Sequence, residues 1–388
     1  MKRYKKFLSI FTIVCILATI IPYNFVNADN LFDLKSESAI LVDAGSGKII
    51  YEKAPHKKLE PASITKIMVL LLAMESLESN RINLNDKVVI SENASSMGGS
   101  QVYLETGEVK TVENLLKAIS VRSANDAAVA LSEHIAGSEE LFIKMMNEKA
   151  KSLGMENTNF VNPTGLTDEN HYTTAYDISI MSRELLKYPK VHQWLTIWMT
   201  TMMVGKENDV EQTLVNTNKL VRFYKGANGI KTGYTSTAGF CLSASATRNR
   251  LTLISVVLGC KTSNNRFSES RKLLDYGFAT YDSLPICKKG DIIKNLPISK
   301  GKIENIDVVA ENDLNLLIKK GQPKKIEKNY ILPKYLMPPL NKNDKIGELV
   351  IKLEGKEVGR VDLIVTKDIE KASFFTMIKK MFSKLVSN

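Results

Sequence analysis

The sequence is poor in the residues that build metal sites and disulfide frameworks. It has four cysteines in 388 residues, and no two of them form a CxxC pair, which excludes a cysteine-built zinc site. Its four histidines include no HExxH motif and no close pair, so a histidine-built metal site is not expected either. No glycine-rich loop of the kind that cradles phosphate is present. We therefore expect a protein that uses no metal and no other cofactor.

Proline is too scarce, and apolar residues are too common, for a disordered or collagen-like chain. There are 11 prolines, while 44% of the residues are hydrophobic and 24% are charged, as in a globular protein. The length suggests two domains, or one domain with additions. The formal net charge of +11 leaves nucleic acid, a membrane surface and an anionic polymer open as partners.

The N-terminus lacks acidic residues and carries a short apolar run. Basic side chains at positions 2, 3, 5 and 6 precede the apolar residues 7–21, and small or β-branched residues lead up to Ala28. This order is typical of a secretory signal peptide, and the run is shorter than the roughly 20 residues of a membrane-spanning helix. We predict a signal peptide over residues 1–28, with cleavage after Ala28. A retained N-terminal anchor is the alternative.

Export changes the expected charge, partners and cysteine chemistry of the mature chain. Cleavage lowers the net charge from +11 to +7, because residues 1–28 hold four basic and no acidic residues. A nucleic-acid partner is not expected for a protein on the extracytoplasmic side of the membrane. The mature chain keeps Cys241, Cys260 and Cys287, an odd number that implies no disulfide framework and predicts buried thiols.

The C-terminus also lacks acidic residues. Residues 371–388 hold four lysines, and their apolar residues recur at helical spacing on one side. A helix with an apolar stripe and a cationic flank lies in the lipid headgroup region rather than crossing the bilayer. We predict an amphipathic helix over residues 368–388 that anchors the protein to the outer face of the cytoplasmic membrane. A helix packed on its own protein is the alternative.

Between these ends the pattern predicts two domains. Residues 29–280 have strand patterns near both ends and helical patterns between them, which indicates an α+β domain with helices packed on an antiparallel sheet. Residues 281–367 show short β-like runs between Lys, Gly and Asn turns, and they predict a small β-rich stalk domain. In the first domain we expect strands within 38–52 and 227–259, and helices near 64–71, 111–121, 125–136 and 140–152, from 174 onward, and over 267–278. In the second domain we expect strands within 303–310, 314–318, 346–353 and 360–365.

Three short motifs of the first domain carry recognisable chemistry. They are Ser63-Ile-Thr-Lys66, Ser123-Ala-Asn125 and Lys231-Thr232-Gly233. Each motif alone is weak, because an ordinary capped helix, a helix N-cap and an edge strand would explain them in turn. Their joint occurrence at wide spacing, each in matching local structure, is much harder to obtain by accident.

The first motif provides an activated nucleophile. Ser63 follows Pro61 at an expected helix start, where backbone N–H groups favour developing negative charge. Lys66 lies one turn later on the same helix face and can reach the Ser63 hydroxyl. A lysine can take the hydroxyl proton when burial and a nearby cation such as Lys231 keep it neutral. The N–H groups of Ser63 and Tyr234 are expected to bind the oxyanion of an acyl-transfer reaction.

The other two motifs provide groups that bind and protonate the substrate. Ser123 could relay a proton to a leaving amine, and Asn125 has a donor and an acceptor for Lys66 and a substrate amide. Gly233 lets an extended substrate approach the strand edge closely. The hydroxyls of Thr232 and Thr235, with the lysine of their motif, can bind a terminal carboxylate.

This set of motifs resembles that of the serine-type D-alanyl-D-alanine carboxypeptidases, which are low-molecular-mass penicillin-binding proteins. The resemblance runs from about residue 32 to the C-terminus and includes the β-rich domain and the amphipathic tail. It extends to the segments PASITKIM (61–68), SANDAAVAL (123–131), FVNPTGL (160–166), GIKTGYT (229–235) and ESRKLLDYGF (269–278).

The resemblance also implies a role for each matching residue. Ser63 would be the acylated nucleophile and Lys66 the general base, with Ser123 and Asn125 as the second element and Lys231, Thr232 and Gly233 as the third. Arg266 stands where the family often has an arginine that assists carboxylate recognition. The sequence Ser-Ala-Asn replaces the Ser-Gly-Asn of many relatives.

The implied reaction is removal of the terminal D-alanine from peptidoglycan stem peptides, with β-lactam antibiotics as acylating mimics of the substrate. A class A β-lactamase is one alternative, but the stretch 162–169 lacks the E-x-x-L-N segment of those enzymes. A wall-binding or regulatory protein that keeps the fold without catalysis is the other alternative. The complete set of three motifs favours the peptidase.

Overall fold

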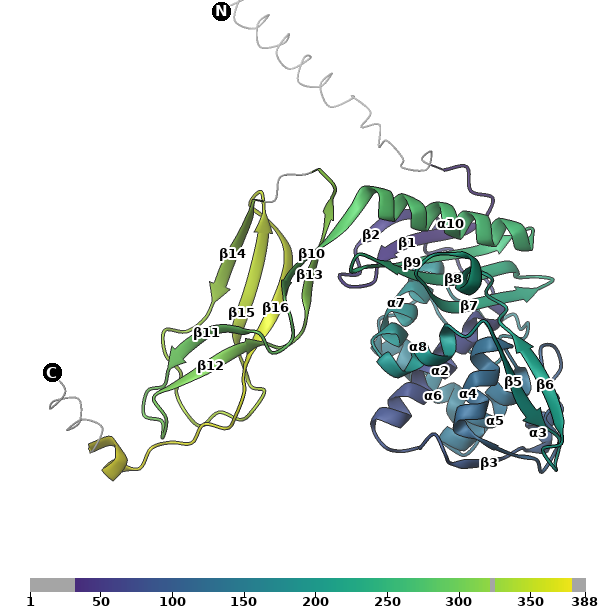
Figure 1. Ribbon diagram of the computed structural model, residues 1–388, viewed down its shortest axis with the longest axis horizontal. Helices are drawn as coiled ribbons and strands as arrows, with labels where there is room; N and C mark the ends of the chain where they lie inside the picture. Colours follow the sequence, from purple (N-terminus) through teal and green to yellow (C-terminus); the bar gives the residue numbers. More distant parts are fainter. Residues whose placement is uncertain (1–31, 322–324, 379–388) are drawn as a thin grey trace, which may run out of the picture. The chain divides into compact units, whose positions relative to one another are not determined.

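The computed structural model describes residues 32–321 and 325–378 (Figure 1). The predicted signal peptide and residues 379–388 of the predicted amphipathic helix lie outside the described residues. Among the described helices, none has both the length and the apolar character needed to cross a bilayer.

A five-stranded antiparallel sheet forms the centre of the first domain (Figure 1). The strands are β1 (Ser38–Asp43), β2 (Ile49–Lys53), β7 (Ala227–Thr235), β8 (Gly239–Arg248) and β9 (Leu251–Cys260). Their order in the sheet is β2-β1-β9-β8-β7, so β1 pairs with the late strand β9 and β7 lies at an edge. The two sheet regions expected from the sequence are confirmed. β8 and β9 are joined by a turn at Asn249 and Arg250, both of which have positive φ.

The helices of this domain pack on the sheet and on each other. They are α2 (Lys66–Glu78), α3 (Glu92–Ser95), α4 (Val112–Val121), α5 (Asn125–Ala136), α6 (Glu139–Ser152), α7 (Ala175–Leu186), α8 (His192–Leu195), α9 (Leu220–Phe223) and α10 (Ser263–Thr280). α10 contacts β8 and β9, and α7 contacts β9 and β1; in Figure 1 the two helices lie on opposite faces of the sheet. α2 is buried along nearly its whole length, as expected for a helix that is apolar on all sides.

Local sequence signals explain several helix starts. Thr174 caps α7, the helix expected from 174 onward, since its hydroxyl accepts a hydrogen bond of 3.0 Å from the Asp177 N–H. The start expected for the first long helix is different: residues Ala62–Thr65 form a 3-10 turn, η2, that leads into α2. A second short 3-10 turn is η3 (Pro189–Val191). Two short two-stranded sheets that we did not predict pair β3 (Lys87–Val89) with β4 (Val109–Thr111), and β5 (Met199–Val204) with β6 (Val210–Val215).

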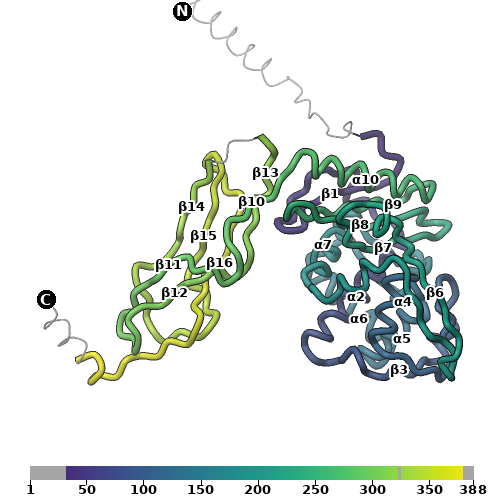
Figure 2. The backbone as a smooth tube through the Cα atoms, viewed as in Figure 1, coloured from purple at the N-terminus to yellow at the C-terminus, as the bar shows by residue number. Residues whose placement is uncertain are grey.

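The chain continues into a β-rich domain, as the fold prediction requires. Its strands are β10 (Tyr281–Cys287), β11 (Ile292–Pro297), β12 (Asn305–Ala310), β13 (Leu314–Lys319), β14 (Ile326–Ile331), β15 (Lys345–Leu353) and β16 (Lys356–Val365). Five of them form a sheet in the order β11-β12-β16-β15-β14, and β10 pairs with β13. Figure 2 shows the long β15–β16 hairpin of this sheet. A separate cluster of buried apolar side chains fills the domain.

The three cysteines of the described chain are free and buried, which confirms the prediction of buried thiols. Burial raises the pKa of the Cys241 thiol to about 11, so this thiol is protonated near neutral pH. At the other end of the described chain, residues 374–378 are helical.

Candidate active site

The first motif forms a hydrogen-bonded cluster around a fully buried lysine. The Lys66 Nζ lies 3.0 Å from the Ser63 Oγ, 2.6 Å from the Asn125 Oδ1 and 2.6 Å from the carbonyl oxygen of Thr164. Two of these partners, the amide oxygen and the carbonyl, can only accept hydrogen bonds. In a neutral Lys66 amine the two protons therefore point at these acceptors, and the lone pair faces the Ser63 hydroxyl.

Electrostatics favours that neutral form. Burial holds the pKa of Lys66 well below its usual value, and the positive charge of Lys231 lowers it further, while Asp126 opposes the shift. Lys231 is itself buried, and burial together with the nearby Arg266 lowers its pKa to about 7. A neutral amine at hydrogen-bond distance from a serine hydroxyl can accept the hydroxyl proton as the oxygen attacks a carbonyl.

The third motif lies on the edge strand β7, which packs directly on the η2 turn. A Cβ atom added at Gly233 would come within 2.8 Å of the Pro61 carbonyl oxygen and 3.1 Å of the Ser63 nitrogen. Glycine is thus required here for packing on the turn that carries Ser63, in addition to the close substrate approach expected from the sequence. Thr232 on the same strand is nearly buried and donates a hydrogen bond of 2.8 Å to Thr217.

The two residues that follow Gly233 are more accessible. Tyr234 is 56% exposed, and its ring stacks on Phe240 at 4.3 Å between centroids. The Thr235 hydroxyl lies 3.2 Å from that of Thr237 and accepts a hydrogen bond from the Ala238 N–H. This end of β7 therefore presents a hydroxyl-lined surface.

Arg266 supports the third motif from inside the protein. It is 9% exposed, and its Nη1 donates a hydrogen bond of 3.0 Å to the Gly233 carbonyl oxygen. Its guanidinium also lies over the rings of Phe240 and Phe267. Its described contacts are thus with the strand and with aromatic rings.

Ser123 of the second motif has an unusual backbone and an unpaired hydroxyl. Its φ of 66° lies in the left-handed region, which is strained for a residue other than glycine. Its Oγ is buried and has no hydrogen-bond partner among the described residues. The N-cap of α5 is Ala124, so capping does not explain Ser123.

The role of the Thr164 carbonyl was not predicted from the sequence. A backbone carbonyl leaves no side-chain signal, but the Asn-Pro-Thr-Gly turn that holds it is readable. The Asn162 Oδ1 accepts hydrogen bonds from the backbone nitrogens of Thr164 and Gly165. Gly165 has a φ of 80°, and a Cβ there would overlap the Ala62 carbonyl oxygen. The turn therefore lies tightly against the nucleophile.

No described group of three or more His, Cys, Asp or Glu side chains is arranged to hold a metal ion. The cluster around Ser63 consists instead of hydroxyl, amine, amide and backbone groups. Such groups are suited to acyl transfer by a serine nucleophile.

Comparison with known proteins gives consistent matches along the chain. The family described as D-alanyl-D-alanine carboxypeptidase matches residues 24–262, and the one described as penicillin-binding protein 5, C-terminal domain, matches residues 281–371. The D-alanyl-D-alanine carboxypeptidase DacF of Bacillus subtilis is 40% identical over 382 residues, which cover 97% of each protein.

Two solved structures are similar over most of the chain. Penicillin-binding protein 5 from Haemophilus influenzae has a TM-score of 0.73 and 32% identity, covering 88% of this chain and 99% of that one. A peptidoglycan synthesis regulatory factor (PBP3) from Streptococcus pneumoniae has a TM-score of 0.71 and 30% identity, covering 87% of this chain and 100% of that one.

Proposed function

This chain belongs to the D-alanyl-D-alanine carboxypeptidase family, and we propose that it removes the terminal D-alanine from peptidoglycan stem peptides through a Ser63 acyl-enzyme. The observation that carries the proposal is the Lys66 amine, whose lone pair faces the Ser63 hydroxyl at 3.0 Å when the amine is neutral. The same geometry accounts for acylation by penicillin, which mimics the D-Ala-D-Ala end.

The proposed reaction has two steps. Ser63 Oγ attacks the carbonyl of the penultimate D-alanine while Lys66 takes the hydroxyl proton, and the backbone N–H groups of Ser63 and Tyr234 bind the oxyanion. The peptide bond then breaks, and Ser123 passes a proton to the departing D-alanine nitrogen. In the second step water attacks the ester, releases the shortened peptide and restores the serine.

The remaining motif residues bind the substrate in this proposal. Lys231, Thr232 and Thr235 hold the terminal carboxylate, and Asn125 holds a backbone amide of the stem peptide. Gly233 lets the peptide backbone approach the edge of β7. Arg266 acts through the strand, because it donates to the Gly233 carbonyl.

Substituting the nucleophile tests the proposal directly. Ser63→Ala should abolish both labelling by a fluorescent penicillin and release of D-alanine from a stem pentapeptide. Ser138→Ala is the control, because it removes only the N-cap of α6, worth about 1 kcal/mol of stability, and should label normally. Labelling of the Ser63→Ala protein would reject the assignment.

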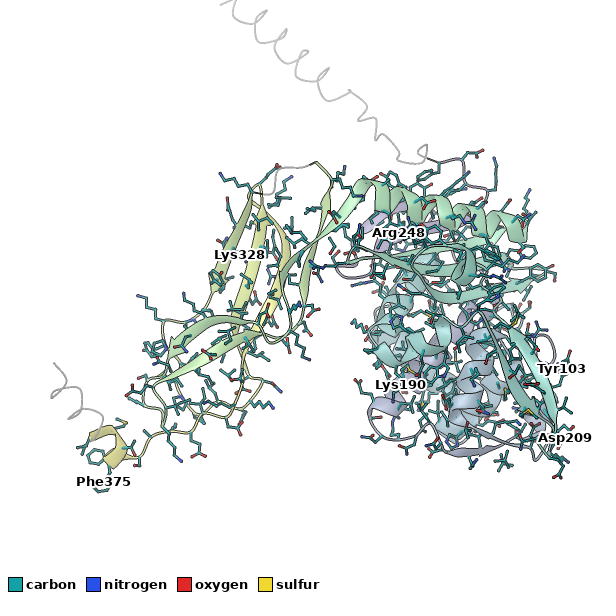
Figure 3. The ribbon with its side chains drawn as sticks, in the orientation of Figure 1. Tyr103, Lys190, Asp209, Arg248, Lys328 and Phe375 are labelled. Atoms are coloured by element: carbon teal, nitrogen blue, oxygen red, sulfur yellow. The ribbon has the colours of Figure 1, made fainter. Side chains whose placement is uncertain are left out.

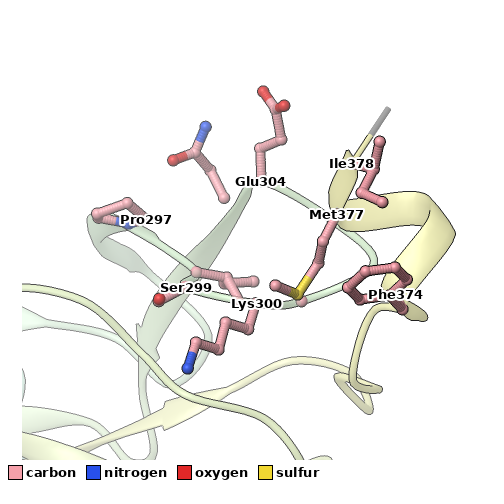
Figure 4. A pocket seen from close by; sticks show the side chains of 10 residues that line it. Pro297, Ser299, Lys300, Glu304, Phe374, Met377 and Ile378 are labelled. Carbon is pink, nitrogen blue, oxygen red and sulfur yellow. The ribbon is translucent and has the colours of Figure 1, made fainter. Parts of the chain in front are cut away.

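We also propose that the protein is exported by residues 1–28 and attached to the outer face of the cytoplasmic membrane by its C-terminal helix. The described start of that helix supports a membrane-facing role, since Phe374 and Phe375 are 72% and 82% exposed. Phe374, Met377 and Ile378 also line an open pocket of about 620 Å³ with residues 297–301, 304 and 305 (Figure 4). Apolar side chains exposed in this way fit contact with lipid.

A further inference from the structure

A buried carboxylate next to Asn125 holds a loop against the candidate active site. Asp126, at 1% exposed, follows Asn125 in the first turn of α5. Its carboxylate accepts hydrogen bonds from the backbone nitrogens of Val102 at 3.1 Å and Leu104 at 3.0 Å, and from that of Ala127 at 2.9 Å. Three N–H donors are the partners expected of an ionised carboxylate.

The residue between the two loop contacts is strained. Tyr103 has a φ of 57°, a conformation that costs roughly 1–2 kcal/mol for a side chain of this kind. Its ring is 66% exposed (labelled in Figure 3), so packing of the ring does not offset the strain. The bonds from Asp126 to the residues on either side of Tyr103 stabilise this conformation.

The same loop fixes the orientation of the Asn125 amide. The Asn125 Nδ2 donates a hydrogen bond of 2.6 Å to the Gly98 carbonyl oxygen, and its backbone nitrogen donates one of 2.7 Å to the Ser100 carbonyl. Because the amide nitrogen is bound to Gly98, the amide oxygen faces Lys66 at 2.6 Å. The loop also approaches closely at Gly99, where a Cβ would lie 2.9 Å from the Asn125 Nδ2.

We propose that Asp126 is a positioning residue for acylation: it clamps loop 98–104 so that the Gly98 carbonyl turns the Asn125 amide oxygen toward Lys66. The inference rests on the proposed function, because it concerns how Lys66 is oriented as the base of the proposed acylation. Asp126 itself lies outside the three motifs. A role in folding alone is the competing explanation.

Substitution of Asp126 by asparagine separates the two explanations. The amide cannot accept from the loop as the carboxylate does, so the rate constant for penicillin acylation on the alkaline side of the Lys66 titration should fall roughly 10- to 100-fold. The substitution also removes a negative charge. The titratable groups that act on Lys66 from the elements around it are Lys231 on β7, Asp126 on α5 and His171 in the loop before α7.

Of these groups, Asp126 favours the protonated form of Lys66. The acylation rate rises with pH as Lys66 loses its proton, and this rise is the acid limb of the pH profile. Loss of the Asp126 charge should therefore move the acid limb to lower pH, by about 0.5–1 unit. Loss of this charge moves the limb under either explanation, so the rate at high pH separates them: a residue needed only for folding would leave that rate unchanged at temperatures where the protein stays folded.

Asp177 provides a matched control. It is also 1% exposed, and its carboxylate likewise anchors a loop, accepting from the Asn157 nitrogen and the Thr158 hydroxyl. Asp177→Asn should lower the melting temperature but leave both the acylation rate and its acid limb unchanged. Gly99→Ala is a second test, because its Cβ displaces the Asn125 amide without removing a charge, and the rate at high pH should fall.

The experiment measures acylation against pH for the wild type and these variants, with mass spectrometry locating the acyl group on Ser63. Wild-type protein that is not acylated there would overturn the proposed function together with this inference. If the wild type is acylated and Asp126→Asn keeps the wild-type rate at high pH, only the inference on Asp126 is wrong. If Asp126→Asn does not fold, Gly99→Ala decides, and a wild-type rate in that variant overturns the clamp.

Discussion

Two buried lysines set the pH range in which the proposed site can work. Lys66 must be neutral to accept a proton, and its pKa is lowered by burial and by Lys231. Lys231 must be charged to bind a carboxylate, and its pKa is about 7. Acylation should therefore rise with pH as Lys66 loses its proton and fall again as Lys231 loses its own, with the two titrations coupled.

Lys231→Met tests this coupling. Without the neighbouring positive charge the protonated form of Lys66 becomes more favourable, so the acid limb of the acylation rate should move to higher pH. The alkaline fall near pH 7 should disappear, and the maximal rate should drop because carboxylate binding is lost. The measurement is the second-order rate constant for penicillin acylation over the pH range in which the protein stays folded.

The matching control removes a lysine charge outside the cluster. Lys57→Met breaks an exposed ion pair with Glu37 and should leave both limbs where they are in the wild type. An acid limb that stays in place in Lys231→Met would show that Lys231 does not tune Lys66.

The residues of the three motifs could be identified from the sequence, but only some of their hydrogen bonds could be predicted. Ser63, Lys66 and Asn125 are joined by hydrogen bonds, as their chemistry led us to expect. The Thr164 carbonyl and the Asp126 clamp were missed. The first is a backbone atom, and the second acts on backbone nitrogens about 22 residues earlier, so neither forms a side-chain pattern.

At the scale of elements, the nucleophile turn is packed by backbone from two sides. The edge strand β7 approaches η2 at Gly233, and the 162–165 turn approaches it at Gly165. Both approaches exclude a Cβ atom, so Ser63 is held between two segments that come from distant parts of the sequence. The position of η2 should therefore be more sensitive to added methyl groups than to the loss of any surface side chain.

Gly165→Ala and Gly154→Ala form a matched pair that tests this packing. Both glycines have positive φ, 80° and 75°, so alanine strains the backbone at each, at a cost of about 1 kcal/mol. At Gly154 a Cβ would have no heavy atom within 4 Å, whereas at Gly165 it would overlap the Ala62 carbonyl oxygen. Gly154→Ala should lose only that stability and acylate normally.

Gly165→Ala should be destabilised further and should acylate about 100-fold more slowly, because η2 must move. Urea denaturation and the acylation rate measure the two effects separately. Equal behaviour of the two variants in both measurements would contradict the packing argument.

The elements that the sequence predicted well are those with long, regular patterns. The helices α4, α5 and α6 and the strands β7, β8 and β9 each have at least nine residues, and their apolar spacing specifies them. The two-stranded sheets β3–β4 and β5–β6 have strands of three and six residues. Such short segments, partly exposed, have too few positions for a period to stand out. The 3-10 start of α2 depends on tertiary packing around Ser63, which local propensity does not describe.

At the scale of the whole molecule, catalysis and attachment are assigned to different parts of the chain. The candidate active site draws its groups from the first domain, and the exposed apolar side chains at 374–378 follow the β-rich domain. The charge pattern of the tail was visible in the sequence because it needs no tertiary contact to be read. Because the two functions lie in different parts of the chain, we expect that membrane attachment can be removed without loss of catalysis.

Deletion of residues 371–388 should therefore release the protein from membranes while leaving catalysis intact. The mature full-length protein should sediment with vesicles that contain anionic phosphatidylglycerol, and the shortened protein should stay in solution. D-Alanine release from a soluble pentapeptide should be the same for both. The double substitution Phe374→Ser and Phe375→Ser is a milder test within the full chain. Because burying one phenylalanine contributes about 1.5–3 kcal/mol, vesicle binding should weaken at least about tenfold for each.

Salt distinguishes the two contributions to this binding. High ionic strength should weaken the share that comes from the tail lysines and leave the apolar share. In cells, a signal peptidase that cuts after Ala28 removes the N-terminal apolar run, so only the C-terminal tail remains to attach the protein. N-terminal sequencing of the membrane-bound protein should therefore begin at Asp29. If the shortened protein still sediments with vesicles, or an intact Met1 is found on the membrane-bound protein, attachment resides elsewhere in the chain and the proposed anchor is wrong.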